Sequence, residues 1–203
     1  EGWHRELLTE FLEHIGGEVL PMGRVTRTFY RLYARAERME TIVLTNLMFE
    51  TIGATTYRLA LRNVRHPAAR SMLTILTRDE SFHVPLNVHF LRHILERDPD
   101  ARRRLRWIFL LLFTSLLALP LASRPKARAF DGIGTRQLAR AYAEYLGRLF
   151  ENEPDLGLRP PRLLLRLLGL TPQELRRTDE LSVASAEAAE RAADRSATVV
   201  TAL

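Results

Sequence analysis

The fold of this chain is decided by residues 78–100, which read RDESFHVPLNVHFLRHILERDPD. The stretch predicts a helix that begins at Pro67 and runs to about Glu96, because the Asp-Pro-Asp at its end is a typical helix stop. Glu80 and His83 stand three residues apart, so on a helix both side chains project from one face. A Glu-x-x-His pair is the ligand unit of helical bundles that hold two metal ions between carboxylates.

The same spacing occurs once more, at Glu1 and His4. One such pair carries little weight in a chain of this composition, whereas two are suggestive. A third carboxylate, Glu50, stands about 15 residues before the turn near Arg65, and Glu80 stands about 14 residues after it. At 1.5 Å per residue both lie about 21–22 Å from the turn, so the two should meet at one level of an antiparallel helix pair.

The rest of the chain reads as helix throughout, and no alternating strand pattern competes, so we expect an all-α protein. The predicted helices cover residues 1–15, 25–64 with a break near 34–38, 67–96, an apolar helix that ends near Pro120, 135–151 and 163–170. Residues 1–122 are expected to form the helical bundle. Residues 123–203 are expected to form a C-terminal helical extension with a partly flexible tail.

Composition narrows the chemistry further. The 203 residues include no cysteine, so metal ligands must be His, Asp or Glu. The net charge of +6 comes from arginines scattered along the chain, and no Gly-rich or aromatic nucleic-acid motif accompanies them, so we expect no nucleic-acid binding. An acidic partner would suit this surface.

The most apolar stretch covers residues 107–122, and basic segments flank it. As a helix it would be about 24 Å long, short of the roughly 30 Å of a bilayer core. A buried bundle helix is therefore favoured over an interfacial anchor, and contact with a membrane surface is not favoured. No signal peptide is visible, so we expect a cytoplasmic protein.

Residues 78–100 resemble the last ligand helix of the ferritin-like di-iron carboxylate oxidases, above all the soluble acyl-carrier-protein desaturases. Two further stretches are similar to other ligand helices of that superfamily: EGWHRELLTEFLEHIGG at 1–17, and FETIGATTYRLA at 49–60. The arylamine N-oxygenases of the superfamily share this ligand plan. Their additional histidine, four residues before the last Glu-x-x-His, has no counterpart here, because that position is Leu76.

The resemblance implies a ferritin-like bundle with two iron ions. It assigns five ligands to this chain: Glu1, His4, Glu50, Glu80 and His83. The sixth would be a glutamate on a helix that precedes Glu1, so the sequence is expected to be truncated at its N-terminus. Asp79 would accept a hydrogen bond from the far nitrogen of His4 and fix its tautomer. The small residues Gly53 and Ala54 would leave room for oxygen beside Glu50.

The implied function is an oxygen-dependent, non-haem di-iron oxidoreductase that desaturates or hydroxylates a hydrophobic, acyl-type substrate. Dioxygen would be the co-substrate, and electrons would come from an external donor. The resemblance also implies a homodimer and an acyl carrier protein as a candidate partner. Three alternatives stay open: N-oxygenation of an amine, metal binding without turnover, and a helical interaction or membrane-surface module in which the Glu/His pairs are accidental.

Overall fold

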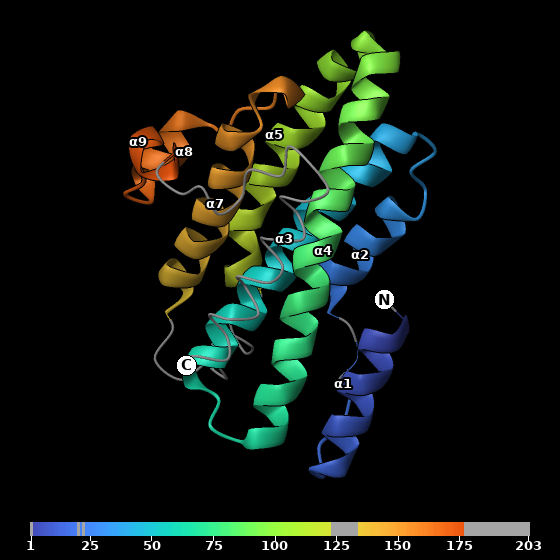
Figure 1. Ribbon diagram of the computed structural model, residues 1–203, viewed down its shortest axis with the longest axis vertical. Coiled ribbons are helices and arrows are strands. Elements are labelled where there is room, and N and C mark those ends of the chain that lie inside the picture. Colours follow the sequence, from blue (N-terminus) through green and yellow to red (C-terminus); the bar gives the residue numbers. More distant parts are fainter. Residues whose placement is uncertain (1, 20, 22, 123–133, 177–203) are drawn as a thin grey trace.

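The computed structural model describes residues 2–19, 21, 23–122 and 134–176, and within them every regular element is a helix (Figure 1). The prediction of an all-α protein is therefore confirmed. The elements in chain order are α1 (Gly2–His14), α2 (Arg24–Tyr33), α3 (Met39–Asn63), α4 (Pro67–Arg97), α5 (Pro99–Ala122), α7 (Thr135–Asn152), the 3-10 turn η1 (Pro154–Leu156), α8 (Arg162–Leu167) and α9 (Pro172–Arg176).

Most helix ends lie where the sequence places them. Gly16, with a φ of +75°, follows α1 and takes a backbone conformation that costs glycine least. His66 caps α4 by accepting a hydrogen bond from the backbone N–H of Ala69 at 3.4 Å. Helix α5 ends near Pro120, as the sequence predicts, and continues two residues further to Ala122. A proline in the last turn of a helix removes a single backbone hydrogen bond, so the helix can continue for two further residues.

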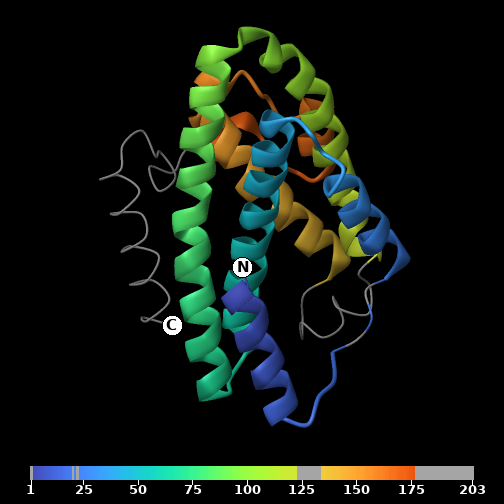
Figure 2. The same cartoon turned by 90° about the vertical axis from the view of Figure 1, so that its right-hand side faces the viewer.

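The antiparallel pair of α3 and α4 forms the frame of the molecule (Figure 1). One face of this pair packs on α5 and α7 through a large apolar cluster that includes Leu44, Leu47, Leu91, Leu105 and Leu146. At the other end, α1 packs on a smaller cluster around Leu61, Met72, Leu73 and Leu76. Helix α1 thus lies along the half of α4 that precedes the Glu-x-x-His motif (Figure 2).

The C-terminal region contributes directly to the large cluster. Leu138, Tyr142, Leu149 and Phe150 of α7 are buried against residues of α3 and α5. The boundary predicted at residue 122 stays a prediction, but the two regions share one apolar core. The predicted flexible tail lies outside the described residues.

The apolar helix α5 is buried on one face only. Leu105, Phe109 and Phe113 are at most 2% exposed, whereas Trp107 is 73% and Leu111 69% exposed. The expectation of a buried helix is therefore wrong for the opposite face. Among the described residues, no helix combines the length and the apolar character needed to cross a bilayer.

Candidate metal centre

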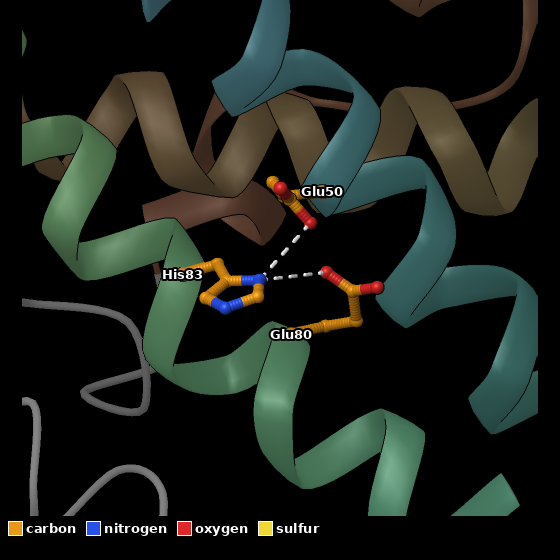
Figure 3. A group of neighbouring side chains, drawn as sticks. All are labelled: Glu50, Glu80 and His83. Carbon is orange, nitrogen blue, oxygen red and sulfur yellow. Dashed lines mark ion pairs between the residues drawn. The ribbon is translucent and has the colours of Figure 1, made fainter. Parts of the chain in front are cut away.

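Three of the predicted ligands come together at the middle of the α3–α4 pair. Glu50 of α3 and Glu80 and His83 of α4 have ligand atoms within 4.8 Å of one another. The Nδ1 atom of His83 lies 3.5 Å from a carboxylate oxygen of Glu50 and 3.6 Å from one of Glu80 (Figure 3). Glu50 and Glu80 share this level because each stands a similar number of residues from the turn that joins the helices.

Helix α1 brings a second imidazole to the same carboxylate. The Nδ1 atom of His4 lies 3.6 Å from Oε1 of Glu80, while the Nδ1 atom of His83 faces Oε2. The two imidazole rings have their centroids 6.0 Å apart. The Glu80 carboxylate therefore lies between two imidazoles, with one oxygen directed to each.

Asp79 forms a hydrogen bond with the imidazole of His4. Its carboxylate lies 3.0 Å from Nε2 of His4, so the hydrogen bond expected from the sequence is present. With Nε2 donating to Asp79, the tautomer of a neutral His4 has its lone pair on Nδ1, the atom that faces Glu80. Asp79 thus determines which nitrogen of His4 is available to a metal.

The exposure of the four side chains increases from Glu80 and His4 to Glu50 and then His83. The side chains of Glu80 and His4 are 5% and 6% exposed, that of Glu50 is 15% exposed, and that of His83 is 30% exposed. Burying two carboxylates and two imidazoles in one place is costly unless protons, hydrogen bonds or a cation balance them. The accessible side of the cluster is the side of His83.

Gly53 and Ala54, the two residues predicted to leave room for oxygen, differ in their surroundings. A Cβ atom built on Gly53 would lie 3.5 Å from Oε1 of Glu80 and 3.6 Å from its carboxyl carbon. The absence of a side chain at Gly53 therefore leaves open one side of the Glu80 carboxylate. Ala54, the next residue, is 1% exposed.

Sequence reasoning missed Tyr33, which α2 places near Glu50. Burial raises the pKa of Tyr33 and the negative charge of Glu50 raises it further, whereas a hydrogen bond to Asn46 acts in the opposite direction. Two aromatic contacts, of Phe29 and Tyr30 with Phe49, hold α2 against this part of α3. The aromatic residues of 29–33 are the sequence signal, but their partner on α3 is known only from the fold.

Glu1, the remaining predicted ligand, lies outside the described residues. The four donors that are described fit a metal centre by their chemistry, since imidazole nitrogen and carboxylate oxygen suit iron, manganese and zinc. Their separations of 3.5–3.6 Å exceed those of good hydrogen bonds, and ligands bound about 2.1 Å from one ion would themselves be about 3.0–3.4 Å apart. Small side-chain shifts would therefore bring them into a coordination sphere.

No family model matches this chain, and neither a curated protein nor a solved structure matches it. What the site does must accordingly be inferred from its own geometry.

Proposed function

We propose that this protein is a di-iron oxidoreductase of the ferritin-like type, which uses dioxygen to desaturate or hydroxylate a hydrophobic, acyl-type substrate. The observation that supports it most is the position of Glu80 between the Nδ1 atoms of His4 and His83, with one oxygen facing each. A carboxylate in that position is suited to bridge two ions, each of which would also be bound by one imidazole.

The remaining residues fit this division. Glu50 lies beside His83 and would bind the same ion as His83. Asp79 keeps the proton of His4 on Nε2. Glu1 is the predicted carboxylate for the ion that His4 would bind. The carboxylates would offset most of the positive charge of the two ions, which isolated imidazoles could not do.

When bound, a pair of ferrous ions supplies the reduction of dioxygen, with further electrons from an external donor. The chain's own residues create the conditions for that chemistry. Glu80 and His4 are screened from water, while Gly53 leaves space beside Glu80. His83, on the accessible side, marks the direction from which a substrate would approach.

Desaturation or hydroxylation is favoured over N-oxygenation by Leu76. In the arylamine N-oxygenases that this chain resembles, the corresponding position carries an additional histidine. Here Leu76 is fully buried among Met72, Leu73 and other apolar side chains. The chain therefore lacks that nitrogen donor and keeps the simpler ligand plan of the desaturases.

The proposal is tested first by metal content. Metal-free protein is loaded with ferrous iron without oxygen, desalted and analysed by atomic emission; we expect two irons per chain. Glu80→Gln should lose most of this iron, because the shared carboxylate loses its charge. Glu96→Gln, an exposed position on the same helix, serves as the control and should keep it. Equal iron in the Glu80 and Glu96 variants would exclude the centre.

Turnover is tested separately. Iron-loaded protein is mixed with a chemical reductant, air and a long-chain acyl thioester, and the products are analysed by mass spectrometry. A loss of 2 Da or a gain of 16 Da in the acyl chain is expected. If an aromatic amine is oxygenated and the acyl chain is unchanged, the reaction is N-oxygenation and not desaturation or hydroxylation. Iron binding without any product would leave a metal-binding protein.

A further inference from the structure

The exposed face of α5 is an unusual surface for a bundle helix. Of the large apolar side chains in the described part of the protein, four are exposed most: Trp107, Leu111, Leu163 and Leu167, at 65–73%. The first two lie on α5 and the other two on the short helix α8, and arginines are interleaved with them on both helices. Helix α5 is the longer of the two and presents the larger face.

The apolar and basic residues of α5 gather on one side of the helix. With 100° per residue, Arg103, Trp107, Leu110 and Leu111 fall within a sector of about 100°, which also contains Asp100, and Arg106 lies about 40° outside it. Leu110 is 38% exposed, and both arginines are exposed. The opposite side holds Leu105, Phe109 and Phe113 in the core. Within the described part of the chain, this second apolar face is not part of the core.

The outward face of α5 carries more positive than negative charge, because Arg103 and Arg106 are exposed and Asp100, in the first turn, is the one acidic residue of the helix. From Ala101 to Ala122 the sequence contains four arginines and no aspartate or glutamate. Arg104 donates hydrogen bonds to Glu40 and Asp98, and Arg102 donates to the backbone oxygen of Asp155. Arg103 and Arg106 are thus the two arginines that stand beside Trp107 on the outward side. A partner for this face must combine negative charge with an apolar layer.

We propose that the outward face of α5 binds the surface of an anionic lipid bilayer. Helix α5 would lie in the plane of the membrane, with Trp107, Leu110 and Leu111 inserted below the headgroups and Arg103 and Arg106 at the level of the phosphates. Helices that lie in the interface combine these features: a basic polar edge, tryptophan and leucine on the apolar side. Figure 2 shows α5 running down the right-hand side of the molecule from the top of α4.

The binding test uses sedimentation of the whole chain with vesicles. We expect the protein to sediment with phosphatidylglycerol vesicles at low salt and to remain in solution with phosphatidylcholine vesicles. Trp107→Ala with Leu111→Ala should weaken binding at least about tenfold through lost insertion. Arg103→Gln with Arg106→Gln should weaken it by about 25-fold, since each arginine contributes about fivefold near an anionic surface.

A control removes two exposed apolar side chains elsewhere, which are 40% and 49% exposed. Leu86→Ala with Phe90→Ala, on the outward side of α4, should leave vesicle binding unchanged. Circular dichroism and thermal unfolding check that each variant keeps its fold. The proposal is overturned if the wild type does not sediment, or if the Trp107/Leu111 variant binds as well as the wild type. Binding to soluble polyglutamate that needs the arginines but not Trp107 would instead identify an acidic protein partner and also overturn it.

The iron-binding proposal is independent of this test. Glu80→Gln should bind vesicles as the wild type does, because the metal cluster and the outward face of α5 share no residue. Failure of the vesicle experiment would therefore leave the di-iron proposal intact, and the reverse also holds.

Discussion

At the scale of single residues, the contact between Gly53 and Glu80 determines how much space adjoins the shared carboxylate. A Cβ atom at Gly53 would meet Oε1 of Glu80 at 3.5 Å, an ordinary contact distance. Alanine therefore fits, and because alanine favours the helix we expect Gly53→Ala to raise the free energy of unfolding by about 0.5–1 kcal/mol. Urea unfolding of the metal-free protein measures this. Lower stability would show that the glycine is needed for the backbone itself.

A larger side chain at the same position should act on the metal instead. The γ-carbons of valine reach about 1.5 Å beyond Cβ, so they would collide with the Glu80 carboxylate and displace it. We expect Gly53→Val to bind iron at least about tenfold more weakly than Gly53→Ala, as measured by equilibrium dialysis. Equal affinities of the two variants would mean that Glu80 does not bind the metal in the position described here.

Asp79 is the residue that acts on the site through another side chain. Asparagine at this position keeps the size of Asp79 but removes the negative charge that holds the proton on Nε2 of His4. Because Asp79 is 39% exposed, we expect the change in stability to stay within about 1 kcal/mol. Iron affinity should fall about 10–100-fold, the usual effect of removing the partner of a ligating histidine. Asp100→Asn is the control, and unchanged affinity in Asp79→Asn would contradict the role.

At the scale of elements, the junction of α4 and α5 depends on Asp98. Its carboxylate accepts hydrogen bonds from the backbone N–H groups of Asp100 and Ala101 and from Arg104. The Arg104 guanidinium, followed by the backbone N–H groups, lowers the pKa of Asp98. A carboxyl group with a lowered folded-state pKa stabilises the fold above its unfolded pKa, and this contribution is lost as the pH falls through the folded value.

Asp98→Asn should therefore unfold at a lower temperature than the wild type at pH 7. The difference between the two proteins should shrink below about pH 4, where the wild-type carboxyl group becomes protonated as well. Thermal unfolding followed by circular dichroism across pH 3–7 measures it. A difference that stays constant over this range would show that hydrogen-bond geometry, rather than the charge of Asp98, stabilises the junction.

How far the sequence predicts these elements depends on whether their signals are local. The ends of α1, α3 and α4 follow from Gly16, the break near 34–38 and His66-Pro67, because capping and proline effects act within a few residues. The meeting of Glu50 and Glu80 follows from helix length alone. The position of Tyr33 near Glu50 could not be predicted, since it depends on how α2 packs after a connection. The exposed face of α5 was missed because its nearly continuous apolar run hides the side that faces solvent.

At the scale of the whole molecule, α7 connects the C-terminal region to the helices of the candidate metal centre. The hydroxyl groups of Tyr142 and Thr56 lie 2.9 Å apart, and Thr56 is less than two turns along α3 from Glu50. The rings of Phe150 and Phe109 pack edge to face at 4.5 Å. Leu146, which is fully buried, lies in the same cluster as Leu47 of α3 and Leu91 of α4. These contacts imply that α3, α4, α5 and α7 unfold as one unit.

Leu146→Ala tests this cooperativity. Removal of a fully buried leucine side chain should lower the free energy of unfolding by about 2–5 kcal/mol. If the helices form one unit, the slowest amides of α3, α4 and α7 should all exchange faster, and by the same factor in each helix. Leu167→Ala, at a leucine that is 65% exposed, is the control and should change neither measurement. Faster exchange confined to α7 would mean that the C-terminal region is a separate unit, and that α3 and α4 hold the Glu and His side chains together without it.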